Sequence, residues 1–283
     1  IPELAELDGV PLGRVERLDV QVDFGYHHVT YLVHPPRAAA PARLLILHQG
    51  HQDGLQGGFV ELAAWALAEG FLVALMQMPY YGWNQQRTFT LPEGAVTLAG
   101  DHNELMETLE GRGGSALRFF LEPVVAVTNC FAAQHPDARD ISMIGLSGGG
   151  WTTHLAAALD PRIRLSVPAA GAYPLYLRDL YPGSRGDLEQ FIPALYEERA
   201  SWLDLFILGG AGAGRRQIQL LNQFDSCCFY GIAYTTYADV VARAAAALGG
   251  RWAAVLDASH RAHLISPWAL ETVIVPALTA ETP

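Results

Sequence analysis

Short apolar runs alternate with amphipathic stretches along most of this chain. Strand-like runs lie at residues 15–24, 29–34, 44–48, 71–77, 140–144, 163–169, 217–224 and 252–257. Helix-like runs follow several of them, at residues 59–69, 115–134, 151–159, 237–248 and 266–278. We expect the first two strands to form an antiparallel pair. The later strand–helix alternation predicts the α/β fold class, with a mostly parallel central sheet and helices on both faces.

Two segments interrupt this alternation. Residues 84–114 have weak periodicity and several glycines, so we expect an irregular excursion with a short helix near 103–110. Residues 171–214 are rich in Tyr, Pro, Leu and Gly and fall between the sixth and seventh expected strands. An insertion at this place in such a sheet covers the edge where a site forms. The pattern therefore predicts one domain, residues 1–283, with a helical or irregular cap insertion at 171–214.

The bulk composition supports a single large domain. Hydrophobic residues make up 51% of the 283 residues and charged residues 17%, which is ample for one buried core. The longest apolar runs are too short to cross a bilayer, so no membrane partner is expected. No signal peptide is visible, but the chain begins at Ile1 rather than Met. A removed leader is therefore left open, and the location is not assigned, with the cytoplasm slightly favoured.

Charge narrows the chemistry further. The net charge is −11, and all 18 basic residues are arginine, since the chain contains no lysine. Chemistry that needs a lysine, such as a Schiff base, a pyridoxal phosphate anchor or a P-loop, is thereby excluded. Without a basic stripe, nucleic acid is not expected as a partner. A small-molecule substrate fits this picture, and the oligomeric state is left open.

The three cysteines do not form a disulfide framework. They are Cys130, Cys227 and Cys228, an odd number with one adjacent pair. Adjacent cysteines can bond to each other only through a strained ring. We therefore expect three free and mostly buried thiols.

The sequence of residues 140–151 carries the strongest chemical signal. An apolar strand runs into Gly145-Leu146-Ser147-Gly148-Gly149, and a helix follows. G-x-S-x-G between a strand and a helix is typical of a nucleophile elbow, in which a sharp turn lifts a serine hydroxyl above the sheet edge. We predict Ser147 as a nucleophile and the Gly148 N–H as an oxyanion donor. The alternative is a glycine-rich turn in which the serine caps the helix.

A serine nucleophile needs a base and a carboxylate that orients the base. Asp225 follows the strand at 217–224 and is the preferred acid, with Asp257 as the rival. His260 and His263 both follow the last strand, and we prefer His263 because it immediately precedes the last helix. The His-x-x-His spacing could hold a metal, but no third ligand sits nearby in an obvious helical frame. We expect neither a metal nor a cofactor.

A second oxyanion donor should come from the loop at residues 48–54. Gly50 lets this turn invert, so the backbone N–H of His51 is the candidate donor. We assign the role to backbone geometry and not to the imidazole of His51, whose side chain could simply hydrogen-bond beneath the loop.

Aromatic residues gather near the expected mouth of the site. They could form an apolar or sugar-stacking substrate pocket, or a small core of the cap itself. The candidate substrate-binding residues are Tyr80, Tyr81, Trp83, Tyr173 and Trp202, with Tyr176 and Tyr181 in the same group.

With these pieces placed, the chain resembles the α/β-hydrolase superfamily from about residue 15 to its end. It looks most like bacterial esterase-like members of the group that includes acetylxylan esterases and dienelactone-hydrolase-like proteins. The matching stretches are residues 48–51, 78–82, 145–149, 224–225 and 263–266. One departure is Gln49, which stands where many members have the histidine of His-Gly.

The resemblance implies a Ser147–His263–Asp225 triad, with Gly148 and His51 as oxyanion donors. It implies hydrolysis of a small to medium apolar or acylated-carbohydrate ester through an acyl-enzyme. A peptidase of the prolyl-oligopeptidase type shares the triad but usually adds a propeller, for which the lead-in here is too short. A non-catalytic binding protein on the same fold usually loses one triad residue, and this sequence has all three.

Overall fold

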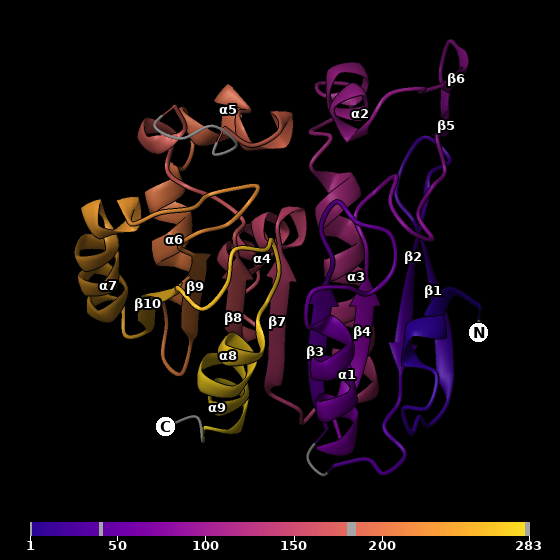
Figure 1. The fold of residues 1–283 in the computed structure, drawn as a ribbon. Coiled ribbons are helices and arrows are strands. Elements are labelled where there is room, and N and C mark those ends of the chain that lie inside the picture. Colours follow the sequence, from indigo (N-terminus) through magenta and orange to yellow (C-terminus); the bar gives the residue numbers. More distant parts are fainter. Residues whose placement is uncertain (1, 40–41, 180–184, 281–283) are drawn as a thin grey trace.

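The computed structural model describes residues 2–39, 42–179 and 185–280. Eight strands form one sheet, in the order β1-β2-β4-β3-β7-β8-β9-β10 (Figure 1). β2 pairs antiparallel with both β1 and β4. The remaining neighbours in this order, from β4 through β3, β7, β8 and β9 to β10, pair parallel. The bounds are β1 Val15–Gln21, β2 His27–Val33, β3 Arg43–His48, β4 Leu72–Met76, β7 Asp140–Leu146, β8 Ile163–Ala169, β9 Arg216–Asn222 and β10 Arg251–Asp257. The predicted antiparallel pair and mostly parallel sheet are confirmed.

Helices cover both faces of this sheet, because its central strands are apolar on both sides. Leu45 and Leu47 of β3 pack in the cluster that contains α1 (Phe59–Ala68) and the C-terminal helix. That helix consists of α8 (Pro267–Ala269), a π-helical turn η5 (Leu270–Ile274) and α9 (Val275–Thr279). Leu44 and Ile46 point to the other side and join the cluster of α3 (Arg118–Gln134) and α4 (Gly148–Leu159). The predicted coverage of both faces is confirmed.

Residues 84–114 and the first part of residues 171–214 lie beyond the end of the sheet at which α4 begins (Figure 1). Residues 84–114 form the predicted helix, α2 (His102–Leu109), and a hairpin of β5 (Thr88–Leu91) and β6 (Gly94–Thr97) that the weak periodicity did not reveal. The first part of the expected cap contains η2 (Leu175–Leu177), η3 (Leu188–Gln190) and α5 (Pro193–Tyr196).

The last part of the expected cap has a different place. Helix α6 (Trp202–Gly210) packs against α4, β9 and β10. It lies in the connection from β8 to β9 and covers the sheet there. Its Ser201 and Asp204 form a reciprocal N-terminal cap, which fixes where this helix begins. Only the segment before α6 therefore extends over the sheet edge. The short helices η1 (Pro2–Leu7) and η4 (Ala233–Thr236) and helix α7 (Ala238–Ala247) complete the described elements.

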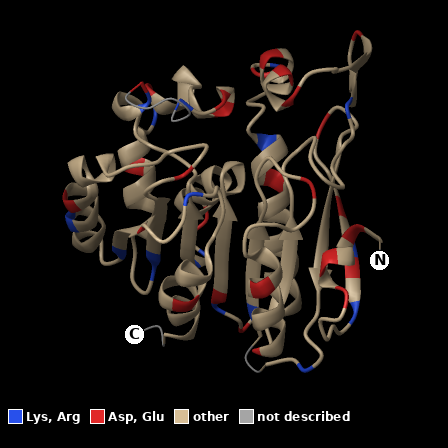
Figure 2. Ribbon diagram, in the orientation of Figure 1, with Lys and Arg blue, Asp and Glu red and all other residues tan. Residues whose placement is uncertain are grey.

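Charge is scattered over the outer surface rather than gathered in a stripe (Figure 2). Arg216 and Arg251 are the first residues of β9 and β10, at the end of the parallel strands opposite the elbow. Among the described residues, no helix has the length and apolar character that a membrane span requires.

Three histidines are buried without charge inside the fold, and they make stability depend on pH. Burial lowers the pKa of His28 to about 3, of His48 to about 4 and of His154 to about 3. The unfolded chain keeps ordinary imidazole pKa values of about 6.5, so it takes up protons first as the pH falls. Stability contributed by these groups is full above about pH 6.5 and is lost progressively below it.

We therefore expect the free energy of unfolding to fall between about pH 7 and pH 5, above the range in which most carboxylates titrate. In that range each of these three histidines should take up about one proton when the chain unfolds. Guanidinium unfolding across this range measures that slope. His154→Gln should reduce the proton uptake by about one. A stability that is flat from pH 7 to pH 5 would contradict the assignment of three neutral buried histidines.

Candidate active site

The elbow predicted around Ser147 has the expected backbone. Strand β7 ends at Leu146, α4 begins at Gly148, and Ser147 between them has φ 58° and ψ −122°. Positive φ is strained for a residue with a side chain, and such residues concentrate at functional sites. The Ser147 N–H donates to the carbonyl of Ala169 at 2.9 Å, and its carbonyl accepts from Trp151 at 2.9 Å. These hydrogen bonds hold the strained turn in place.

The glycines around Ser147 are required by close backbone approach. A Cβ on Gly145 would overlap the carbonyl of Gly149, and a Cβ on Gly149 would overlap the carbonyl of His48. A Cβ on Gly50 would lie 2.6 Å from the Leu146 carbonyl oxygen and 2.7 Å from Ser147 Cβ. The loop after β3 therefore lies directly against the elbow.

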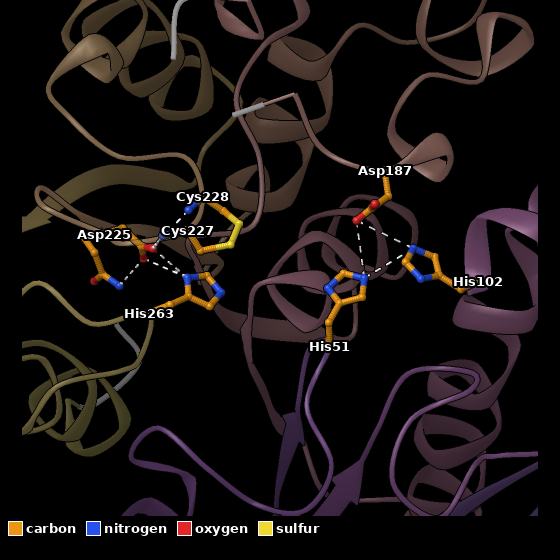
Figure 3. The surroundings of a disulfide bond; sticks show 8 residues. His51, His102, Asp187, Asp225, Cys227, Cys228 and His263 are labelled. Atoms are coloured by element: carbon orange, nitrogen blue, oxygen red, sulfur yellow. Dashed lines mark hydrogen bonds and ion pairs between the residues drawn. A yellow bond between two sulfur atoms is a disulfide. The ribbon is translucent and has the colours of Figure 1, made fainter. Parts of the chain in front are cut away.

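His263 and Asp225 form a hydrogen-bonded pair. His263 Nδ1 lies 2.8 Å from Asp225 Oδ2 and 2.9 Å from Oδ1 (Figure 3). The backbone N–H groups of Cys227 and Cys228 donate to Oδ1 at 2.7 and 3.1 Å, and Asn222 Nδ2 donates to Oδ2 at 3.0 Å. Burial alone would raise the pKa of Asp225, but the hydrogen bond and charge of His263 and these N–H donors lower it. The carboxylate is therefore ionised and fixes the imidazole ring.

The rival residues form a second pair of their own. His260 Nε2 lies 3.3 Å from Asp257 Oδ2, and Asp257 also accepts from the backbone N–H of Ser259 at 2.8 Å and from the Ser266 hydroxyl. Ser266 in turn caps α8 by accepting from Ala269. Asp257 is thus committed to the turn that starts the C-terminal helix.

One cavity of about 570 Å³ brings the candidate residues together. Ser147, Gly148, His51 and His263 border it, while neither Asp257 nor His260 does. His263 Nε2 is buried and has no hydrogen-bond partner among the described residues. This nitrogen is therefore free to accept a proton on the cavity side of the ring. The remaining lining residues are Gln49, Gly50, Gln52, Tyr81, Asp101, His102, Leu146, Arg185, Gly186, Asp187, Gln190, Cys227, Cys228 and Phe229.

Two backbone N–H groups beside the elbow, those of Gly148 and His51, are the candidate oxyanion donors. Gly148 is the first residue of α4, where the N–H has no acceptor within the helix. The His51 N–H makes no hydrogen bond within the described part of the chain. A Cβ on Gly148 would lie 2.9 Å from His51 Cε1, so the imidazole of His51 lies beside the elbow as well.

Of the aromatic residues near the turn after β4, Tyr81 alone lines the cavity. Tyr80 is 4% exposed, with the Arg87 guanidinium 4.7 Å from its ring centre. Trp83 donates its indole N–H to the Val29 carbonyl at 2.8 Å and packs edge-on against Tyr31. Tyr80 and Trp83 therefore stabilise the turn rather than form the pocket wall.

The aromatic residues of the expected cap also lie away from the cavity wall. Tyr173 is fully buried and donates its hydroxyl proton to the Tyr230 carbonyl at 3.0 Å. Trp202 is 1% exposed and stacks on Tyr196, with ring centres 4.9 Å apart. Tyr176 is 57% exposed and bonds to Thr236, while Tyr181 lies outside the described residues. Tyr173 and Trp202 therefore belong to a small buried core beneath this segment.

The prediction of three free, buried thiols is wrong for the adjacent pair. Cys227 and Cys228 form a disulfide bond that borders the cavity, and Cys227 is exposed (Figure 3). Cys130 is a free, half-buried thiol. The expectation of free thiols rested on the odd number of cysteines and on ring strain, whereas in the fold the turn of the pair is held by two N–H bonds to Asp225.

Sequence reasoning also missed His102 and Asp187, which line the cavity, and the fully buried Glu189, which contacts His102. Burial, together with the neighbouring His102, lowers the pKa of His51 to about 4. Burial alone would lower the pKa of His102, but the hydrogen bond to the buried Glu189 carboxylate raises it above its ordinary value. Burial raises the pKa of Glu189. No local motif joins these residues, because they come from segments far apart in the chain.

Solved structures resemble this chain at low sequence identity. The acetyl xylan esterase from Paenibacillus sp. R4 is 18% identical, with a TM-score of 0.59 over 96% of this chain and 90% of that one. A cold-adapted esterase from an Arctic intertidal metagenomic library is 15% identical, with a TM-score of 0.59 over 95% of this chain and 97% of that one. The acylaminoacyl peptidase of Pyrococcus horikoshii is 11% identical, with a TM-score of 0.58 over 94% of this chain.

This chain spans only 39% of the length of that peptidase. No family model matches the sequence, and no curated protein matches it. The structural likeness establishes that the chain has the α/β-hydrolase fold, as its motifs predicted.

Proposed function

We propose that this protein is a serine hydrolase that cleaves carboxylic esters through an acyl-enzyme. The observation that carries the proposal is the Asp225–His263 pair, whose histidine borders the same cavity as the strained Ser147. A base oriented by an ionised carboxylate beside a serine at an elbow is the arrangement that activates a hydroxyl group. The structural likeness to two esterases is consistent with this chemistry.

The proposed reaction begins when Ser147 Oγ attacks the ester carbonyl carbon and its proton passes to His263 Nε2. Asp225 holds the Nδ1–H side of the ring and stabilises the imidazolium. The negative charge on the carbonyl oxygen is met by the N–H groups of Gly148 and His51. His263 then returns the proton to the leaving alcohol, which leaves an acyl group on Ser147. A water molecule, deprotonated by His263, hydrolyses the acyl-enzyme and restores the serine.

The cavity restricts the ester to small or medium size. Its volume of about 570 Å³ lies within the range of small-molecule pockets. Tyr81 and Phe229 supply aromatic surface, and Asp101, Asp187, Gln190 and Arg185 supply polar groups, a mixture that suits an acylated carbohydrate or a short acyl ester. Because the structural neighbours include an acylaminoacyl peptidase, amide cleavage is the second candidate.

A direct test combines active-site labelling with a substrate series. A fluorophosphonate probe should label Ser147, as located by peptide mass mapping. The series should include p-nitrophenyl acetate, butyrate and octanoate, acetylated xylo-oligosaccharides and an N-acetylated amino-acid anilide. We expect kcat/KM to be highest for short-chain or sugar acetate esters and far lower for the anilide. Labelling without ester turnover, or a preference for the anilide, would remove the ester assignment.

A further inference from the structure

Three metal-ligating atoms converge on one side of the cavity. His51 Nε2 lies 3.3 Å from His102 Nε2 and 3.4 Å from Asp187 Oδ2, and His102 Nε2 lies 3.7 Å from Asp187 Oδ2. In Figure 3 the two rings and the carboxylate point toward one another, on the side of the view away from the Asp225–His263 pair. The proposed hydrolysis uses the backbone of His51, and none of these three side chains.

Hydrogen bonds alone do not account for this arrangement. Each imidazole can carry at most one proton on Nε2. If both rings carry it, two N–H groups face each other across 3.3 Å. If one ring carries it, a nitrogen lone pair on the other ring faces the Asp187 carboxylate. His102 Nε2 additionally faces the buried Glu189 Oε2 at 3.2 Å. In the one-proton state, two carboxylates and one ring nitrogen therefore compete for a single proton. A cation among these atoms would satisfy all of them at once.

The Asp187 carboxylate is already oriented for such a role. Asn103 Nδ2 donates to Asp187 Oδ1 at 3.2 Å, and Asn103 Oδ1 accepts from the Leu188 N–H at 2.8 Å. One carboxylate oxygen is therefore held by Asn103 while the other, Oδ2, faces both histidines. Outer hydrogen bonds that fix a ligand in this way are a regular feature of protein metal sites.

We propose that His51, His102 and Asp187 bind a divalent transition-metal ion of the zinc class. An ion centred on a triangle of this size lies about 2 Å from each corner, which is the usual distance from zinc to imidazole nitrogen and carboxylate oxygen. Two imidazoles and one carboxylate favour zinc over calcium or magnesium, which prefer oxygen ligands. Three protein ligands leave a further position open toward the cavity.

A second candidate cluster lies nearby and is less suited to a metal. Among the described residues, Cys227, Cys228 and His263 also have ligand atoms close to one another. The two sulfurs are bonded to each other, so neither is a thiolate, and His263 Nδ1 is engaged by Asp225. Mutation of each cluster shows which of the two binds a metal ion.

The proposed ion would join three separate segments. His51 lies in the loop after β3, His102 opens α2, and Asp187 immediately precedes η3 in the segment that extends over the sheet edge. Metal binding should therefore hold the segment around Asp187 against the core. Zinc that binds the folded chain should also raise its Tm by mass action.

Equilibrium titration of the full chain with zinc alone, without reductant, tests the site. We expect saturable binding of one ion in the micromolar range or tighter, a higher Tm with zinc than with EDTA, and no comparable effect of calcium or magnesium. Loss of an outer hydrogen-bond partner typically weakens metal binding by about 10–100-fold. Asp187→Asn and His102→Gln each alter a direct ligand, so each should weaken zinc binding by at least that much. Asn103→Ala should itself cost about 10–100-fold.

Two control variants show whether zinc binds to these three side chains or elsewhere on the cavity wall. Asp101→Asn changes a carboxylate on the same cavity but keeps a cap for α2, so it should leave zinc affinity within a few-fold of wild type. Replacing Cys227 and Cys228 together with serine should also leave it unchanged. Cobalt added in place of zinc should show intense visible absorption that is lost in Asp187→Asn. Unchanged zinc affinity in both ligand variants, loss in the serine double variant, or no saturable binding below millimolar zinc would overturn the proposal.

Discussion

Replacing Ser147 with alanine should lower kcat for ester hydrolysis by about 10⁴-fold or more, because the substitution removes the nucleophile itself. The fold should persist. Alanine carries a Cβ as serine does, so the strain at φ 58° is the same in both proteins. The Ser147 hydrogen bonds to Ala169 and Trp151 are backbone bonds and survive the change. Steady-state turnover of p-nitrophenyl acetate, with Tm measured in parallel, checks both expectations.

Ser226→Ala provides the matched control for this change. Ser226 is an exposed serine beside Asp225 in the neighbouring loop, and its loss should change neither turnover nor labelling by a fluorophosphonate. A Ser147→Ala protein that retains near-normal turnover, at an unchanged Tm, would be incompatible with the proposed nucleophile and with the acyl-enzyme.

The parts of the molecule that the sequence predicted are those set by local chemistry. The elbow needs glycine at Gly145 and Gly149 because the backbones of neighbouring segments occupy the space of a side chain. That constraint leaves a motif in the sequence itself. The coverage of both faces likewise follows from apolar runs such as residues 44–47, whose side chains alternate between two cores.

The parts that escaped prediction depend on contacts between distant segments. His102, Asp187 and Glu189 meet only after the segment before η3 packs on α2, and nothing near any one of them in sequence announces that packing. The aromatic candidates raised the same difficulty. Composition could not separate Tyr81, which lines the cavity, from Trp202, which is 1% exposed in the core. The hydrophobicity of a residue predicts that its side chain will be buried, but it does not predict which neighbours will cover it.

The preference for His263 over His260 rested on position in the chain, and the structure supplies an independent physical basis for a test. Each histidine has its own aspartate, and of these four residues only His263 lines the cavity. We expect His263→Ala to lower kcat about as severely as loss of Ser147, since residues that act as a unit lose activity together. His260→Ala should change kcat by less than about tenfold, and the ratio of the two kcat values for p-nitrophenyl acetate decides the assignment.

Substitution of Asp225 should affect activity, whereas substitution of Asp257 should affect stability. Asp225→Asn leaves a side chain of the same shape but no longer imposes the right tautomer on His263, and a change of this kind costs about 10⁴-fold in kcat. Asp257→Asn should instead cost about 2 kcal/mol of unfolding free energy with little change in kcat. The reason is that the buried Asp257 accepts from Ser259 and Ser266 at the start of α8 and touches nothing in the cavity. Turnover and guanidinium unfolding, measured on both variants, distinguish these effects. A large loss of turnover in Asp257→Asn with normal activity in Asp225→Asn would transfer the role of acid, and with it that of base, to the Asp257–His260 pair.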